Sequence, residues 1–158
     1  MYIAQIRFLG YADLDKILEL NKQITSTWTA EIIASDLSED SNEGITYIGA
    51  FSSTLEERLL GYAVLGIENN VKKCGVLMLL LVDRNYFRMG IATQLMIAIS
   101  DCASYLRYKK LKLRVRKSNR AAISLYSKLN FRKESVIEGY YSDGEDAYMM
   151  VSRVPIGI

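Results

Sequence analysis

The feature that most constrains this chain is a continuous apolar run followed by a glycine turn. Residues 74–82, CGVLMLLLV, are too uniformly apolar for a strand with one face in water, so they predict the central strand of a sheet. Gly90 stands where this pattern gives way to a helical one, although glycine lowers helix propensity by about 1 kcal/mol relative to alanine. The helical pattern consists of Ile91, Leu95, Ala98, Ile99, Cys102 and Leu106. We therefore expect a group that a side chain would exclude to lie close to the backbone at Gly90.

The remaining patterns predict an α/β fold, a mixed sheet of about seven strands with helices on both faces. Apolar alternation or apolar runs predict further strands at residues 3–8, 45–51, 58–68, 111–116, 131–141 and 146–154. Helical spacing predicts helices at residues 12–23, from 29 to about 37, and at 121–129. The polar segment 38–44 and the dipeptide Asp143-Gly144 are expected to form turns. Ser118 or Asn119 is expected to cap the last helix, and Asn130 to close it in a left-handed conformation.

Length and composition predict a single domain over residues 1–158. Cys74 and Cys102 lie in apolar or helical patterns, which favours two reduced, buried thiols. No apolar run approaches the roughly 20 residues of a membrane span, and the start of the chain does not resemble a signal peptide, so a cytoplasmic protein is expected. The chain contains no histidine, which excludes hydrolase triads that need it. No metal is expected either, because histidine is the commonest metal ligand.

The net charge is only +2, so the chain as a whole carries no electrostatic signature of a nucleic-acid-binding protein. The distribution is uneven, because residues 107–120 hold eight of the twenty Lys and Arg residues. This segment has three interpretations: a nucleic-acid patch, a surface for a phosphorylated ligand, or a solvated edge.

A strand that leads through a glycine turn into a helix is an arrangement that favours phosphate binding. The turn exposes backbone N–H groups, and the helix N-terminus adds about half a positive charge. Gly90 and Ala92 would let a phosphate approach, although neither the dinucleotide fingerprint nor the P-loop motif is present. Close packing of the helix on the strand is the alternative explanation for the small residues.

Three segments carry a resemblance to the GCN5-related N-acetyltransferases, the GNAT superfamily. FRMGIATQLM (87–96) resembles the acyl-CoA pyrophosphate loop of that family, and LRVRKSNRAAISLYSKLNF (113–131) resembles its next strand and helix. GYYSDGEDAYMM (139–150) is more specific, and resembles the catalytic subunits of N-terminal acetyltransferase A and the ribosomal-protein alanine acetyltransferases. The good match covers residues 75–153. It implies a GNAT-like, mostly antiparallel sheet and acetyl-CoA as cosubstrate.

The resemblance also implies roles for individual residues. Leu80, Leu81 and Val82 would pair through their backbone with the pantetheine arm. The pyrophosphate would be wrapped by Arg88, Met89, Gly90, Ile91, Ala92 and Thr93. Asn119 would bind the pantetheine side, and Tyr126 would lie near the thioester sulfur and protonate the departing thiolate. A core aromatic on an amphipathic helix is the alternative for Tyr126. Tyr140 and Tyr141 would hold the first residues of a peptide, with Trp28 in the substrate region.

Two positions depart from the family pattern. Phe87 stands where the family usually has glutamine or arginine, which removes one side-chain contact to the phosphates. Arg114 stands where relatives commonly carry histidine or glutamate, and an arginine cannot act as a base at neutral pH. Glu68 and Glu31 are the candidate bases, with water as the alternative, because a free α-amine has a pKa of only about 8.

Three functions follow from these observations. The first is transfer of an acetyl group from acetyl-CoA to the free N-terminal α-amine of proteins or peptides, by direct attack in a ternary complex. The second is acetylation of a lysine side chain or a small amine on the same fold. The third is a noncatalytic acyl-CoA-binding or ribosome-associated module, which the residues Phe87 and Arg114 keep open. Expected partners are protein N-termini, with the ribosome or an auxiliary subunit as further partners. Specific nucleic-acid recognition and membrane association are not expected.

Overall fold

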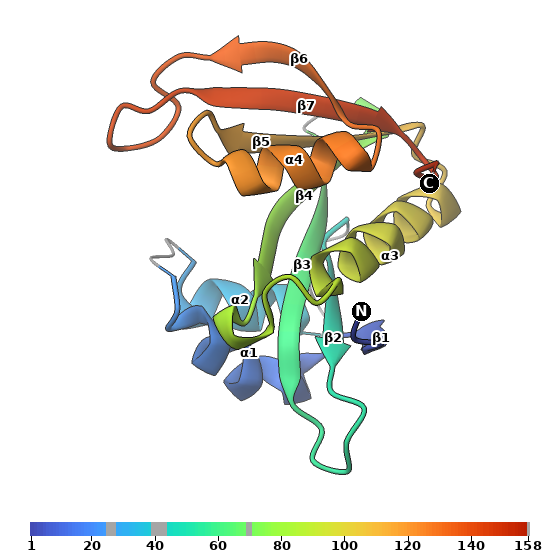
Figure 1. The fold of residues 1–158 in the computed structure, drawn as a ribbon. Coiled ribbons are helices and arrows are strands. Elements are labelled where there is room, and N and C mark those ends of the chain that lie inside the picture. Colours follow the sequence, from blue (N-terminus) through green and yellow to red (C-terminus); the bar gives the residue numbers. More distant parts are fainter. Residues whose placement is uncertain (25–27, 39–43, 69–70, 158) are drawn as a thin grey trace. The chain divides into compact units, whose positions relative to one another are not determined.

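The computed structural model describes residues 1–24, 28–38, 44–68 and 71–157, which form two compact units. The first unit contains Met1–Gly66 and Met78–Ile99, and the second contains Ile67–Leu77 and Ser100–Ile158. The strands form one seven-stranded sheet in the order β1-β2-β3-β4-β5-β7-β6, in which β4 and β5 are parallel and the other described strand pairs are antiparallel (Figure 1). The fold class predicted from the sequence is confirmed.

The first unit holds the N-terminal strands and three α-helices. Its elements are β1 (Gln5–Phe8), the 3-10 turn η1 (Tyr11–Asp13), α1 (Leu14–Asn21), α2 (Ala30–Leu37), β2 (Thr46–Phe51), most of β3 (Leu59–Glu68), the end of β4 (Val71–Val82), the 3-10 turn η2 (Arg84–Tyr86) and most of α3 (Ile91–Tyr105). The core under α1 and α2 contains Ile17, Ile33, Tyr47, Tyr62 and Val64. α3 approaches the opposite face. A Cβ added at Gly61 would point away from the Tyr62 side chain and would lie 3.3 Å from Leu95.

Buried tyrosines connect both helices of this core to the strands. The Tyr47 hydroxyl donates a hydrogen bond to Asp36 of α2 at 2.8 Å, and the Tyr62 hydroxyl donates one to Asn21 of α1 at 2.6 Å. Burial is the main cause that raises the pKa of Tyr62 to about 12. Each phenol therefore satisfies its polar atom inside an apolar layer and fixes the position of one helix.

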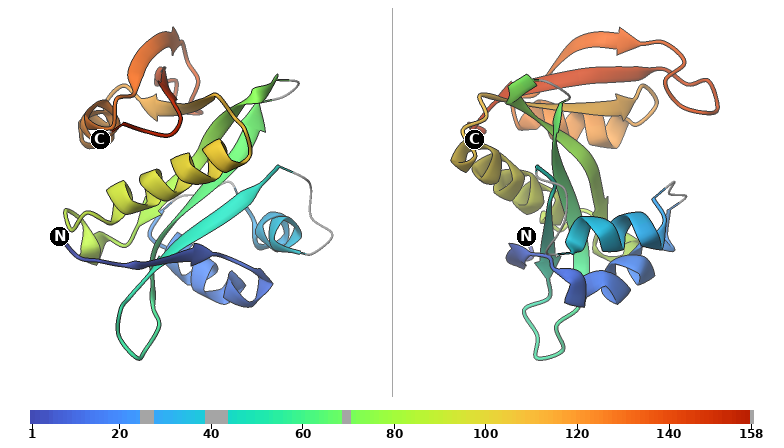
Figure 2. Two further views of the ribbon diagram at one scale, coloured as in Figure 1. Left: turned by 90° about the vertical axis from the view of Figure 1, so that its right-hand side faces the viewer. Right: turned by 180° about the vertical axis from the view of Figure 1, so that it is seen from behind.

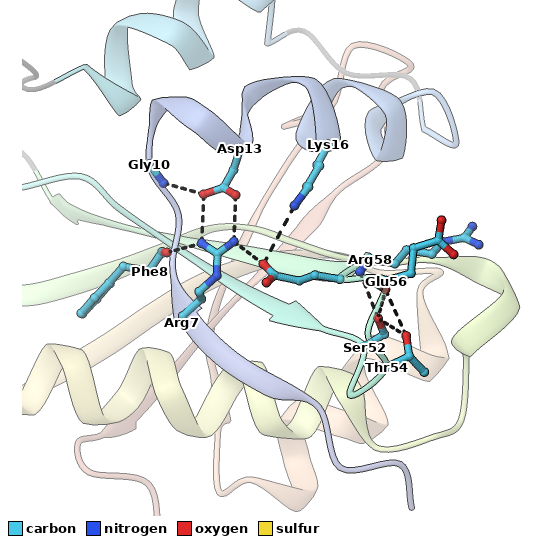
Figure 3. Close-up of polar contacts among 10 residues, drawn as sticks. Arg7, Phe8, Gly10, Asp13, Lys16, Ser52, Thr54, Glu56 and Arg58 are labelled. Atoms are coloured by element: carbon cyan, nitrogen blue, oxygen red, sulfur yellow. Dashed lines mark hydrogen bonds and ion pairs between the residues drawn. The ribbon is translucent and has the colours of Figure 1, made fainter.

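Charged side chains connect the edge strand β1 to α1 and to the β2–β3 hairpin (Figure 3). Arg7 forms two hydrogen bonds to the buried carboxylate of Asp13, at 2.9 and 3.1 Å, and a third to Glu57 at 2.6 Å. The Gly10 amide also donates to Asp13, and Lys16 lies 3.9 Å from Glu57. These contacts hold the pKa of Asp13 below its usual value, with the Arg7 hydrogen bond as the largest cause.

The second unit contains the start of β4, then β5 (Lys110–Arg116), α4 (Arg120–Lys128), β6 (Arg132–Ile137) and β7 (Ala147–Arg153). Figures 1 and 2 show α4, in orange, lying along one face of β5 and β7. On β5, Leu111, Leu113 and Val115 are buried and the residues between them are not, which is the period-two pattern that the sequence predicts.

Most predicted elements are confirmed within one to three residues, and one is wrong in its extent. The strand predicted over 131–141 ends at Ile137, so Tyr140 and Tyr141 lie in a loop that runs from 138 to 146. Gly139 in the left-handed region, at φ 59°, turns the chain out of the strand, and its N–H donates to the Asp146 side chain. Most of the turn predicted at 38–44 lies outside the described residues. None of the described helices is both long and apolar enough to span a membrane.

Candidate active site

The segment between β4 and α3 forms a tight loop in the first unit. Asp83, almost fully buried, caps η2 by accepting a hydrogen bond from the Asn85 N–H at 3.0 Å. Arg88 and Gly90 both lie in the left-handed region, at φ 62° and 84°. A non-glycine residue at positive φ is uncommon and costs about 1 kcal/mol or more, so the loop at Arg88 holds a strained backbone.

This loop and the start of α3 present a row of free donors. Within the described residues, the backbone N–H groups from 88 to 93 donate to no other protein group, and the first helical bond is from Gln94 N–H to the Gly90 carbonyl. The first N–H groups of any helix lack intrahelical acceptors, and here the preceding loop adds more. Such a set of free N–H groups at a helix N-terminus favours a phosphate or another anion.

The N-terminal segment holds this loop through the side chain of Gln94. The Gln94 amide nitrogen donates to the carbonyls of Tyr2, at 2.6 Å, and Gly90, at 3.1 Å. Its oxygen accepts a hydrogen bond from the Ala4 N–H at 3.0 Å, and the Tyr2 N–H donates to the Met89 carbonyl at 2.8 Å. Sequence reasoning missed Gln94, because its partners are about 90 residues away along the chain and nothing local marks them.

The end of β4 leads directly into the loop. Leu81 is buried, and Leu80 and Val82 are half-buried. Leu60 of β3 accepts a hydrogen bond from the Asp83 N–H at 2.7 Å. The strand predicted to carry the pantetheine arm therefore has apolar side chains that fix it in the core.

In the second unit, α4 positions the other two predicted cofactor residues. Asn119 is the N-cap of this helix, and its side-chain oxygen accepts a hydrogen bond from the Ala122 N–H at 3.1 Å. Tyr126 is 7% exposed, and its ring centroid lies 5.9 Å from that of Phe131. Burial, with a smaller contribution from the nearby phenol of Tyr141, raises the pKa of Tyr126 to about 12. The Tyr126 hydroxyl donates to no group among the described residues, so it is available to a ligand.

The loop before β7 gathers aromatic and cationic side chains in the same unit. Tyr140 and Tyr141 meet edge to face with ring centroids 5.0 Å apart. Arg116 lies over the Tyr141 ring at 4.0 Å and Arg114 near the Tyr140 ring at 5.6 Å. The Arg114 Nε is buried and has no hydrogen-bond partner among the described residues. The predicted substrate tyrosines are thus brought together, and Arg114 lies near one of them.

The remaining predicted residues lie elsewhere. Glu68 is half-exposed in the second unit, 3.6 Å from the Lys112 ammonium. Glu31 is exposed in the first turn of α2, where a negative charge also stabilises the helix N-terminus. Trp28 packs on the core of the first unit, with its ring centroid 6.3 Å from that of Tyr47. Among the described residues, no cluster of three or more His, Cys, Asp and Glu side chains is arranged to hold a metal.

Comparison with known proteins identifies the class to which this fold and loop belong. The model of the acetyltransferase (GNAT) family matches residues 13–131. An N-alpha-acetyltransferase of Saccharolobus solfataricus is 33% identical over 149 residues, which cover 87% of this chain and 86% of that protein. The catalytic subunit of the N-terminal acetyltransferase A complex of Arabidopsis thaliana is 38% identical over 96 residues, 59% of this chain and 50% of that protein. The chain belongs to the acetyltransferase (GNAT) family.

Solved structures show the same fold at lower sequence identity. Ard1 from Thermoplasma volcanium is 23% identical with a TM-score of 0.79, and the alignment covers 96% of this chain and 98% of that one. The ribosomal-protein-S18-alanine N-acetyltransferase of Escherichia coli is 24% identical with a TM-score of 0.79, over 98% and 96% of the two chains. NAA60 of Arabidopsis thaliana, solved with acetyl-CoA, is 19% identical with a TM-score of 0.80, over 95% and 98%.

Proposed function

We propose that this chain transfers an acetyl group from acetyl-CoA to the free N-terminal α-amine of proteins or peptides. The observation that carries the proposal is the loop from 88 to 93, whose N–H groups are free within the described residues and lie at the start of α3. The relatives named N-alpha-acetyltransferase, in Saccharolobus solfataricus and Sulfurisphaera tokodaii, support the α-amine as acceptor. The loop binds the pyrophosphate of acetyl-CoA, and the backbone of Leu80, Leu81 and Val82 pairs with its pantetheine arm.

Acetyl transfer needs an amine nucleophile, a stabilised oxyanion and a proton for the leaving thiolate. Attack of the amine nitrogen on the thioester carbonyl forms the new C–N bond, and backbone N–H groups stabilise the oxyanion. Collapse then breaks the C–S bond. The Tyr126 hydroxyl donates a hydrogen bond to the sulfur as negative charge develops there, and Asn119 contacts the pantetheine.

The raised pKa of Tyr126 refines this role. A phenol with a pKa of about 12 is protonated throughout the neutral range, so it is always a donor. Complete proton transfer to a thiolate whose acid has a pKa near 8.5 would be unfavourable. Tyr126 therefore stabilises the thiolate by a charge-assisted hydrogen bond, and the nitrogen of the acetylated amine supplies the proton that the thiol finally keeps.

The base for the ammonium form of the substrate is less constrained. An α-amine with a pKa of about 8 is partly neutral at pH 7, so water suffices as the proton acceptor. Glu68 and Glu31 are the protein candidates, and Glu68 lies 3.6 Å from the Lys112 ammonium. A protein base would add its own titration to the pH profile of kcat/KM, whereas the water route would leave only that of the substrate amine.

Peptide N-termini are the proposed acceptors, held by Tyr140 and Tyr141, with Trp28 in the substrate region. An auxiliary subunit is a further proposed partner, because the relative in Arabidopsis thaliana is described as the catalytic subunit of a complex. Ribosome association belongs to the same proposal.

A peptide panel tests the acceptor. Peptides that differ in their first two residues are incubated with acetyl-CoA, beside α-blocked peptides that carry a free lysine. We expect acetylation of free N-termini and little of the blocked peptides. Equal rates on both sets would instead support acetylation of lysine side chains or small amines. Binding of acetyl-CoA without acetylation of any peptide would support a noncatalytic module.

Initial-rate kinetics test the direct attack. Varying peptide and acetyl-CoA together should give intersecting double-reciprocal lines, as expected for a ternary complex. Parallel lines would indicate a covalent acetyl-enzyme and would contradict direct attack.

A further inference from the structure

Carboxylates pair with two of the four cations of β5, Lys112 and Arg116. The Lys112 ammonium lies 3.6 Å from Glu68 and 3.5 Å from Glu134. The Arg116 guanidinium lies 2.8 and 2.9 Å from two carboxylates of the loop before β7. Carboxylates therefore offset the charge of Lys112 and Arg116, whereas Arg114 lies near the Tyr140 ring, at 5.6 Å.

The start of β5 differs. Lys110 stands directly opposite Arg153 of β7, and Arg132 of β6 stands opposite Val151, two residues before Arg153. Because strand side chains alternate, the three cations share one face of the sheet. All three are exposed, and none lies within 4.0 Å of a carboxylate oxygen among the described residues. Like charges directly opposite each other destabilise a sheet, so the pair of Lys110 and Arg153 is held at a cost.

These cations line a cavity of about 580 Å³ in the second unit. Asn130 and Ser152 add polar groups to its lining, and Glu134 is its single carboxylate among the described residues. Glu134 is already the partner of Lys112. The volume is in the range of small-ligand sites, and the net charge of the lining is positive.

We propose that this cavity binds the phosphates of a polyphosphate or polynucleotide ligand. The attraction of Lys110 and Arg153 to two or more phosphate charges would outweigh the repulsion between the two cations, and Arg132 would form a bidentate contact. The site is distinct from the acetyl-CoA residues of the same unit, because β5 separates Lys110 from Asn119 by roughly 20 Å of extended chain. It does not depend on the proposed acetyl transfer.

The test uses the intact chain with saturating acetyl-CoA present, so that the cofactor phosphates are not the ligand measured. The probes are inorganic tripolyphosphate and a fluorescent 12-nucleotide oligo(U), followed by thermal melting and fluorescence anisotropy. Lys110→Gln combined with Arg153→Gln should weaken binding at least tenfold. Lys133→Gln is the matched control, because this neighbour of Arg132 lies over the Tyr148 ring instead, at 4.1 Å.

A second measurement separates a ligand site from a structural role. Without any anion, Lys110→Gln alone should raise the melting temperature slightly, because it removes the repulsion, while lowering the affinity for tripolyphosphate. If Lys110 had only a structural role, its substitution would lower both the melting temperature and the affinity for tripolyphosphate.

The two probes distinguish the sources of phosphate. Tighter binding of oligo(U), with a salt slope that falls by about 1.4 when two contacts are lost, would indicate a polynucleotide. Equal or tighter binding of tripolyphosphate would indicate a free polyphosphate. Absence of binding to both probes at low salt, equal binding by the double variant, or complete displacement by acetyl-CoA would overturn the proposal.

Discussion

Replacing Gln94 with alanine should weaken acetyl-CoA binding without slowing the chemical step. Gln94 makes three side-chain hydrogen bonds, of 2.6, 3.0 and 3.1 Å, that join Tyr2 and Ala4 to Gly90. Each hydrogen bond contributes a net of about 1 kcal/mol. Water replaces part of this loss because the bonds are partly exposed, and alanine recovers a few tenths of a kcal/mol in helix propensity. The substitution should therefore remove a net of about 1–2 kcal/mol from the free energy that keeps the loop ordered.

That free energy must then be supplied by the cofactor when it binds. Since 1.4 kcal/mol corresponds to a factor of ten, the affinity for acetyl-CoA should fall about tenfold, with kcat nearly unchanged. The melting temperature should fall by about 2–8 °C. Titration calorimetry with acetyl-CoA, well below the melting temperature, and initial rates on the same preparation provide the measurements.

Two further variants make the result specific. Gln94→Glu keeps the acceptor for the Ala4 N–H, loses both donors and adds a negative charge, so it should bind acetyl-CoA more weakly than Gln94→Ala. Asp101→Ala, an exposed position on the same helix, is the matched control and should bind normally. Wild-type affinity in a Gln94→Ala protein with lowered melting temperature would refute the reasoning, because the contacts would then support the fold and not the loop.

Four other changes test the remaining assignments. Gly90→Glu should abolish acetyl-CoA binding, whereas Gly90→Ala, which adds strain at φ 84° without charge, should bind detectably. If calorimetry shows the same loss of acetyl-CoA affinity in both variants, backbone strain alone would explain the effect. Tyr126→Phe should lower turnover by on the order of 10² with near-normal affinity, and a wild-type rate would remove the hydroxyl from the mechanism. Because Arg7 lowers the pKa of Asp13, this pair stabilises the fold at neutral pH and loses that contribution as the pH falls below about 4. Asp13→Asn should therefore flatten the acid side of the melting profile, and an unchanged profile would contradict the ion pair's role. Asn119→Ala should cost about 1 kcal/mol of stability through the lost cap, measured by denaturant unfolding; unchanged stability would show that the cap contributes nothing.

Local signals predicted most of the fold, because the forces that they report act over a few residues. The period-two pattern of β5 and the cap at Asn119 are both present as expected. Asn130 closes α4 at φ 70°, in the left-handed conformation that asparagine tolerates better than most residues.

The same reasoning failed where the chain leaves a strand without a change in composition. Tyr140 and Tyr141 look like strand residues, yet the loop around them is closed by bonds between its own members, including Tyr141 N–H to the Glu145 carbonyl at 3.1 Å. Adjacent side chains face opposite sides only within a strand. In the loop, the two rings meet edge to face with centroids 5.0 Å apart.

Contacts between segments that are distant in the sequence determine the features that local patterns do not predict. The loop before α3 depends on such contacts most. A glycine in the left-handed region is predictable at Gly90, but nothing local requires Arg88 to adopt φ 62°. That strain persists only if the surroundings hold it, and the hydrogen bonds of Gln94 and Tyr2 to the loop supply the restraint. An unstrained loop would be free to turn its N–H groups toward other acceptors. We therefore interpret the strained Arg88 and the long-range hydrogen bonds of Gln94 and Tyr2 as parts of one arrangement. This arrangement keeps the N–H donors available at the position of the proposed phosphate.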